Sequence, residues 1–416
     1  MCSTAFVTLG QAQLRSLGCA STPIAVVPHP FGLRTRDEIR ALAERCTADI
    51  VRHALGANAP TNEHPKTNDT PPPAAHLSLP GDIVTFNEQC LNNGWSDGLP
   101  LIPPTPERVR AMLSASRRSP TEIVAQLAPG FGAASIERIA INAVMAGCRP
   151  EYLRLVIAAV EAVADPSFNL QGIQATTNSA TPWIIVSGPL ARELGFNATM
   201  NCLGQGNWAN ATLGRALRLI LQNIGGAAPG DMDRATHGQP GKYSFCCAEN
   251  EAQSPWPALH CERGYASEQS AVTVVGASGT VNMNSHAKDA PDLLRALADS
   301  LAFPTSNDYH FDGEPWIVLS PEHAEVCQRA GLSKADVKAE LWAQSKMSAS
   351  RFAAKDYQRA DHTRGAELGA FTPETLVPIS RRPDDIGIVV AGGPGTHSVY
   401  VPTFGQTRAV TRPVKF

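Results

Sequence analysis

Apolar residues recur at three- and four-residue steps in several segments of the chain, which predicts amphipathic helices. The clearest of these segments runs from Arg36 to Leu55, where charged residues separate the apolar positions. Thr105 before a proline, and Ser333 paired with Asp336, are typical of helix starts. Further helices are expected at 86–91, 135–146, 151–164, 213–224 and 292–301.

Short apolar runs between these helices predict buried strands. They lie at 173–177, 183–186, 271–275, 316–319 and 387–391. Because strands alternate with helices, the pattern predicts an α/β fold with short, largely parallel sheets flanked by helices and joined by long ordered loops. The loops between residues 225 and 270 are long for a compact domain, which favours a functional site there.

A proline-rich stretch divides the chain. Residues 58–80 hold six prolines among Asn, Thr and Asp, so they cannot bury enough apolar surface to fold and should form a semi-rigid, protease-sensitive linker. We therefore expect a small α/β segment at 1–57 and a main α/β unit at 81–416, which could hold two subdomains. The small segment has too little core to be stable alone, so it should pack on the main unit or on a partner chain.

The composition and charge of the chain argue against several classes of partner. The net charge of −3 provides no basic surface for nucleic acid and no polybasic membrane patch. The sequence contains no apolar run of about 18 residues and no signal-peptide pattern. Its ten cysteines include no CxxC pair, which indicates reduced thiols in a cytoplasmic protein. We expect a small-molecule substrate, no nucleic-acid or membrane partner, and compatibility with a homo-oligomer.

The stretch from Lys242 to Arg263 is the richest in reactive groups. Nucleophilic and acid/base chemistry needs such groups on loops that a rigid scaffold holds. Alternatively, the two adjacent cysteines lie in a strand, with one of them buried, and the glutamates are solvated. The catalytic candidates are Cys246, Cys247, Glu249 and His260, with Lys242 and Arg263 as anchors for substrate charge. A cysteine of this stretch with Glu249, His260 and Glu262 could also hold a divalent metal, although the spacing matches no standard metal motif.

Polar groups also follow three of the expected strands. They are Thr176, Thr177 and Asn178, then His323, and finally Gly393 and His397 in a glycine-rich turn. Because carboxyl ends of parallel strands converge on one edge of a sheet, we expect them to form one site with the Lys242–Arg263 loop. The alternatives are a strand-end turn for 176–178 and a helix-capping role for His323.

A further candidate precedes the helix at 213–224. Glycines followed by Asn210 could form an anion pocket of backbone N–H groups, or simply a turn with a helix cap.

Residues 23–32 form an apolar strand that enters a Pro-His-Pro-Phe turn, and an amphipathic helix follows. This run resembles the last third of the UGSC-motif family, named for its Sec/Cys-Gly-Ser-Cys redox motif, and more distantly the end of the selenocysteine subunits of glycine-type reductases. In those proteins the redox motif lies upstream, and Cys2–Phe6 would align just after the strand that follows it. We expect a truncated start, a loss of that chemistry, or another polypeptide that supplies it.

Residues 84–413 resemble a second region that accompanies UGSC-type domains in bacterial proteins. The matching phrases lie at 93–100, 140–148 and 214–219. The resemblance implies thiol- or selenol-linked redox or elimination chemistry, but it transfers no catalytic residue, because the redox motif is absent.

Three hypotheses follow. The leading one is an enzyme, an oxidoreductase or lyase, that acts on a small polar metabolite by thiol-linked reductive cleavage or elimination. Cys246 or Cys247 would supply the thiolate and His260 the acid/base. The second is a metal-dependent hydrolase or hydratase that uses the same loop. The third is a non-catalytic subunit of a thiol/selenol redox complex, whose partner protein carries the missing Cys/Sec motif. The sequence specifies no cofactor.

Overall fold

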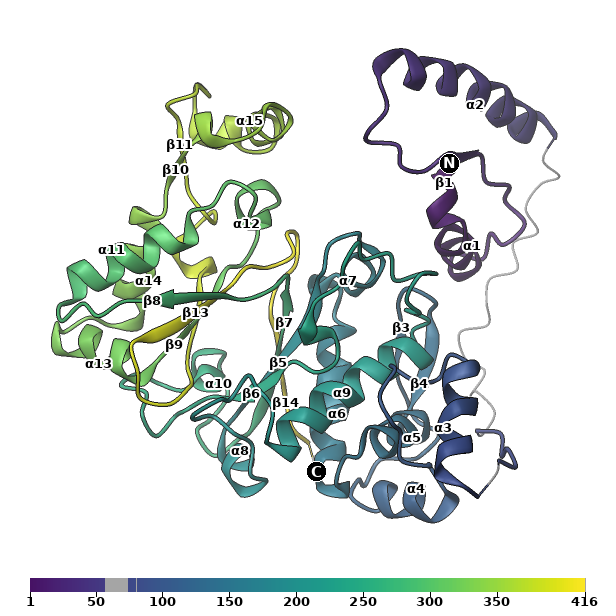
Figure 1. Ribbon diagram of the computed structural model, residues 1–416, viewed down its shortest axis with the longest axis horizontal. Helices are drawn as coiled ribbons and strands as arrows, with labels where there is room; N and C mark the ends of the chain where they lie inside the picture. The colour runs from purple at the N-terminus through teal and green to yellow at the C-terminus, as the bar shows by residue number, and fades with distance from the viewer. Residues whose placement is uncertain (57–73, 80, 416) are drawn as a thin grey trace.

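The computed structural model describes residues 1–56, 74–79 and 81–415 (Figure 1). The linker expected at 58–80 therefore lies largely outside the described residues. Its described part, 74–79, has no regular structure, and the Ala74 backbone N–H donates a hydrogen bond to Glu137.

The longer helices are α1 (Val7–Ser16), α2 (Arg36–Gly56), α3 (Ile83–Asn92), α4 (Pro106–Leu113), α5 (Ile136–Ala146), α6 (Leu153–Val163), α9 (Trp208–Asn223), α11 (Ala290–Leu301), α13 (Pro321–Arg329), α14 (Lys334–Gln344) and α15 (Ala354–Leu368). The shorter helices are α7 (Leu170–Ala175), α8 (Pro189–Glu193), α10 (Leu259–Glu262) and α12 (Asn307–His310).

Two four-stranded sheets lie at the centre of the described residues. The first has the order β14-β7-β5-β6, and the second has the order β12-β9-β13-β8. In each sheet one pair is parallel, β5 with β6 and β9 with β12, and the other pairs are antiparallel. The α/β class is thus confirmed, but the sheets are mixed rather than largely parallel. Their bounds are β5 (Thr181–Ser187), β6 (Cys246–Ala248), β7 (Ala271–Ala277), β14 (Val410–Pro413), β8 (Val281–Asn284), β9 (Trp316–Leu319), β12 (Gly387–Val390) and β13 (His397–Val401).

Short two-stranded sheets complete the described strands. They are β1 (Cys2–Ser3) with β2 (Val26–Val27), β3 (Ile123–Leu127) with β4 (Gly132–Ser135), and β10 (Met347–Ser348) with β11 (Leu376–Val377).

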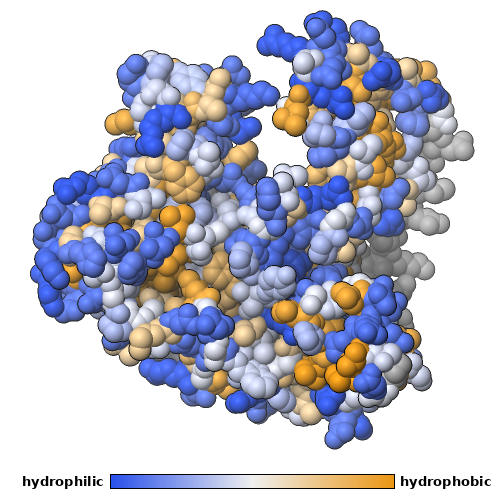
Figure 2. Space-filling view, viewed as in Figure 1, coloured by the Kyte–Doolittle hydropathy of each residue, from blue (hydrophilic) through white to orange (hydrophobic). Residues whose placement is uncertain are grey.

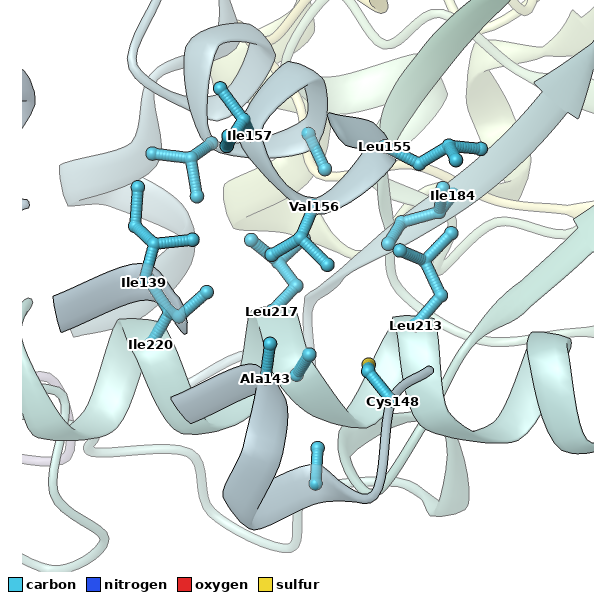
Figure 3. Close-up of a cluster of buried hydrophobic side chains, with 14 of the residues drawn as sticks. Ile139, Ala143, Cys148, Leu155, Val156, Ile157, Ile184, Leu213, Leu217 and Ile220 are labelled. Atoms are coloured by element: carbon cyan, nitrogen blue, oxygen red, sulfur yellow. The ribbon is translucent and has the colours of Figure 1, made fainter. Parts of the chain in front are cut away.

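The two large sheets pack face to face between two layers of helices (Figure 1). Alternate residues of β5 and β9, including Trp183 and Trp316, point into a shared core between the sheets. The residues between them point outward, as strand geometry requires. On the first sheet they meet α5, α6 and α9, and on the second they meet α11 and α14. Figure 3 shows the first of these outer cores, where Ile184 of β5 lies near Leu155, Val156, Leu213 and Leu217.

Helical periodicity predicted most of the helices, with one error. Residues 173–177 were expected to form a strand, but 170–175 form helix α7, which the Asn169 side chain caps by accepting a hydrogen bond from the Gly172 N–H. A run this short has too few turns to reveal a helical period. As a result, residues 176–178 do not follow a strand, and they precede β5 instead.

The N-terminal segment has little core of its own. Its buried apolar cluster consists of Ala25, Val27 and Cys46. Gln171 of α7 donates a 2.6 Å hydrogen bond to Gln13 of α1, which links this segment to the main unit. Among the described helices, none has the length and apolar character that crossing a membrane requires.

An apolar surface covers part of α3. Ile83, Val84 and Leu91 are exposed there, and Figure 2 shows hydrophobic residues gathered over this part of the molecule.

Candidate functional site

Strands β5 and β6 run in parallel, and polar side chains collect where both end. Glu249 directly follows β6, and its backbone N–H donates to the Val186 carbonyl of β5. One carboxylate oxygen, Oε2, accepts from the Ser187 hydroxyl at 3.0 Å and from the Leu259 N–H at 2.8 Å. These bonds fix the Glu249 carboxylate between the end of β5 and the start of α10.

Glu251 reaches the same place from the loop that follows β6. Its carboxylate accepts a hydrogen bond from the Gly188 N–H. Gly188 has a φ of 95°, and a Cβ there would meet the Gln269 carbonyl oxygen at 2.4 Å. Only glycine therefore fits this turn, which aims a backbone donor at Glu251.

His260 of α10 completes a cluster with the buried Glu249 and the half-buried Glu251. Ligand atoms of Glu249, Glu251 and His260 all lie within 4.8 Å of one another. Burial raises the pKa of Glu249 to about 7, and the negative charge of Glu251 contributes in the same direction. The side chain of His260 is 1% exposed, with Nδ1 at 3.9 Å from Glu251 Oε1, too far for a hydrogen bond.

Two atoms in this cluster are buried without a hydrogen-bond partner among the described residues. They are Glu249 Oε1 and His260 Nδ1. Buried polar atoms are almost always satisfied, so two orphaned atoms in one cluster indicate an absent partner. An ionised carboxylate oxygen accepts only, and an imidazole nitrogen accepts when the other ring nitrogen carries the proton. A cation, rather than another acceptor, therefore fits between them.

The neighbouring charges are engaged elsewhere. Glu262, a candidate metal ligand from its sequence position, forms a 2.6 Å ion pair with the largely buried Lys334. It therefore does not join the cluster.

Asn250, between the two glutamates, donates its backbone N–H to the Val390 carbonyl of β12 and its side-chain amide to the Gly392 carbonyl. The loop that holds the cluster thus contacts the start of the glycine-rich turn.

The two adjacent cysteines lie inside the fold. Cys246 faces the helical core and Cys247 the core between the sheets, since they are neighbours on strand β6. Burial raises the pKa of the Cys246 thiol, and a hydrogen bond to Cys202 together with burial raises that of Cys247. Both thiols are thus held in the protonated form, which is a poor nucleophile.

Lys242 and residues 176–178 lie at the opposite, amino end of the parallel pair. Lys242 precedes β6 and binds Asp233 at 2.6 and 2.8 Å. Thr177 precedes β5, and its carbonyl accepts from Thr236. The prediction that Thr176, Thr177 and Asn178 follow a strand is wrong, and the length of β5 separates them from Glu249.

His323 has a structural role, because both ring nitrogens form hydrogen bonds within the fold. It is 2% exposed, with Nε2 at 3.0 Å from the Ser285 carbonyl and Nδ1 at 2.7 Å from the Ser398 hydroxyl. A carbonyl can only accept, so Nε2 carries the proton and Nδ1 accepts from Ser398. Burial lowers the pKa of His323, and neither nitrogen is left free for proton transfer.

The remaining candidates have structural partners. Asn210 binds backbone groups of Asn197 and Cys202, so it ties a loop to α9, and the cap of this helix is Asn207, whose side chain accepts from the Asn210 N–H. Arg263 lies 3.8 Å from Glu314 and over the Trp316 ring. Gly393 lies against Met200, which a Cβ there would meet at 2.1 Å, and His397 is exposed beside Asn282.

Sequence reasoning did not single out Glu251 or Ser187. Glu251 stands two residues after Glu249, and Ser187 ends a strand, which is where ligand groups collect in parallel sheets. That spacing and that position were the available signals.

Comparison with known proteins identifies part of the chain. Residues 1–56 match the model of the UGSC family, in agreement with the resemblance of residues 23–32 and their surroundings. No curated protein matches the chain. The match does not include Glu249, Glu251 or His260.

Proposed function

We propose that the protein is a metal-dependent hydrolase or hydratase that acts on a small polar metabolite in the cytoplasm. Glu249, Glu251 and His260 would bind one divalent cation. The observation that carries this proposal is the pair of buried, unpartnered atoms, Glu249 Oε1 and His260 Nδ1, beside a second carboxylate.

Two carboxylates and one imidazole suit a divalent ion such as Mn²⁺, Fe²⁺ or Zn²⁺. Three protein ligands leave coordination positions for water and a substrate oxygen, and the bound ion would lower the pKa of that water. The chain's own groups hold the ligands in place. Ser187 and the Leu259 N–H orient Glu249, and the Gly188 N–H orients Glu251. Such outer hydrogen bonds strengthen metal binding.

Equilibrium dialysis against Mn²⁺ or Zn²⁺, with the bound metal counted by elemental analysis, tests the site. We expect one ion per chain in the wild type and loss of that ion in Glu249→Gln and in His260→Ala. Glu268→Gln and His237→Ala are matched controls, because both side chains are exposed and lie outside the cluster. These controls should bind like the wild type.

Two outcomes would contradict the proposal. One is a wild type that binds no divalent metal. The other is equal loss of binding in Glu268→Gln and Glu249→Gln. Circular dichroism of each variant would separate loss of the site from loss of the fold.

One observation favours thiol-linked chemistry as a second candidate. A hydrogen bond from the Cys247 thiol and nearby backbone N–H groups lower the pKa of Cys202, although the side chain is buried. The thiolate needed for redox chemistry would then be Cys202, with Cys247 as its partner. The test is thiol alkylation at pH 7, which compares the buried Cys202 with the partly exposed Cys261. Modification of Cys202 first would support this candidate, and modification of Cys261 first would count against it.

A further inference from the structure

A second polar cluster lies at the amino end of β5 and is built on one face of α9. Arg215, Arg218 and Gln222 follow each other at three- and four-residue spacing on this helix. Arg215 binds Asp97 through two nitrogens, at 2.7 and 2.9 Å, and it also reaches the Leu99 and Pro100 carbonyls. Gln222 binds the Gly94 and Ser96 carbonyls. The outer two side chains therefore fasten the loop at 94–100 to α9.

Arg218, between them, is far less satisfied. It is 8% exposed, and its one hydrogen bond within the described residues runs from Nη2 to Gln174 Oε1 at 3.0 Å. A guanidinium group has five N–H donors, and a buried one is normally paired with an anion. Arg218 thus retains unused donors, and none of its nitrogens is fully buried without a partner in the described part of the chain, so a ligand can approach these donors from the surface.

The nearby carboxylates do not neutralise it. Asp97 and Asp233 are close enough to act on the charge of Arg218, but Asp97 is bound by Arg215, and Asp233 by Lys242. Three cations, Arg215, Arg218 and Lys242, therefore share two carboxylates. The cluster carries one positive charge in excess.

Gln174 adds a second, independent sign of an absent ligand. Its side chain is 2% exposed, and Nε2 is buried without a hydrogen-bond partner among the described residues. The amide cannot be turned over, because Oε1 must face the donating Arg218. The orphaned group is therefore a donor, next to the unused donors of Arg218.

We propose that Arg218 and Gln174 bind the carboxylate group of a small organic acid at the amino end of β5. A planar guanidinium matches a carboxylate through two parallel N–H···O bonds, and a single negative charge balances the excess. Phosphate would bring about −1.5 to −2 charges, more than the cluster can neutralise. This site is separate from the Glu249 cluster and does not depend on the metal proposal.

The test is calorimetric titration of the full chain with sodium acetate, and separately with sodium phosphate, at ionic strength held constant with sodium chloride. We expect acetate to bind with one site per chain and to raise the melting temperature by about 2 °C or more at saturation. Arg218→Lys keeps the positive charge but loses the planar guanidinium group that forms two parallel hydrogen bonds. Its affinity for acetate should therefore fall by about tenfold.

Gln174→Glu is the sharper variant, because it places a carboxylate of the same size beside Arg218. It should melt at a higher temperature than the wild type without acetate and should no longer respond to acetate. Gln328→Glu, at an exposed position of α13, is the matched control and should respond like the wild type. The proposal is overturned if acetate has no effect beyond chloride, if phosphate binds and acetate does not, or if Gln174→Glu keeps the full acetate response.

Discussion

The two ends of strand β5 hold buried polar clusters of opposite kinds. At the carboxyl end, Glu249 and His260 present acceptor atoms without donors. At the amino end, Arg218 and Gln174 present donors without acceptors. The carboxyl-end cluster lacks a partner for its acceptors, and the amino-end cluster lacks a partner for its donors. The length of β5 separates the two clusters. The orphaned atoms therefore indicate the charge of each missing ligand, a cation at one end and an anion at the other.

The largest expected effect comes from neutralising a carboxylate at the amino end. Asp233→Asn would leave Lys242, whose side chain is 17% exposed, without its ion-pair partner beside the buried Arg218, so we expect a loss of about 3–5 kcal/mol of unfolding free energy. Urea denaturation in chloride buffer measures it, and Asp231→Asn, at an exposed neighbouring position, is the control. An equal, small effect of both substitutions would show that the amino end has no excess of positive charge.

A reciprocal experiment tests whether the clusters are independent. Mn²⁺ at about 100 times its Kd should stabilise the wild type and Gln174→Glu by about 2.7 kcal/mol, and should not stabilise Glu249→Gln. Acetate should stabilise the wild type and Glu249→Gln, and should not stabilise Gln174→Glu. Melting curves of chelator-treated protein provide the measurement. If a variant at one end of β5 abolished stabilisation by the ligand of the other end, the two clusters would not be independent.

Asp308 shows how a buried carboxylate behaves when it has its partners. Tyr400 and Thr403 donate to it, and burial raises its pKa to about 6 from an ordinary value of 3.8. Because the folded state holds this proton more tightly, unfolding free energy should fall as pH rises from about 4 to 6, by about 2–3 kcal/mol at most. Asp308→Asn lacks this titration. The stability advantage of the wild type over this variant should therefore shrink by that amount between pH 4 and pH 7 in urea unfolding, whereas a pH-independent difference would disprove the assignment.

The smallest effect concerns the support of Glu249. Ser187→Ala removes one hydrogen bond to its carboxylate, so the affinity for Mn²⁺ should fall by about tenfold. Ser179→Ala, near the other end of β5, is the control and should bind Mn²⁺ like the wild type. An unchanged affinity in Ser187→Ala would mean that the hydroxyl does not orient the ligand.

Local sequence patterns predicted much of the fold. Helices α2, α5 and α6 have a clear three- to four-residue period, and Ser333 with Asp336 forms the expected capping box on α14. The strand directions were not predictable in the same way, because the antiparallel partners of β5 and β9 are set by packing between distant segments. Periodicity over six residues could not distinguish α7 from a strand.

The candidate site was predicted only in part. The richness of the Lys242–Arg263 stretch drew attention to Glu249 and His260, which the structure places in one cluster. However, β6 runs through this stretch, so Lys242 lies at one end of the sheet and Glu249 at the other. The pairing of Arg218 with Gln174 joins positions 44 residues apart, and no local pattern encodes such a contact.

The most direct test of the metal centre is X-ray diffraction from crystals of the full chain soaked in Mn²⁺, recorded where manganese scatters anomalously. We expect one anomalous peak bounded by Glu249, Glu251 and His260, within about 2.0–2.3 Å of their ligand atoms. We also expect the peak to be absent from crystals of Glu249→Gln. A wild-type crystal that holds manganese elsewhere, with these three side chains unchanged and no peak between them, would contradict the central claim.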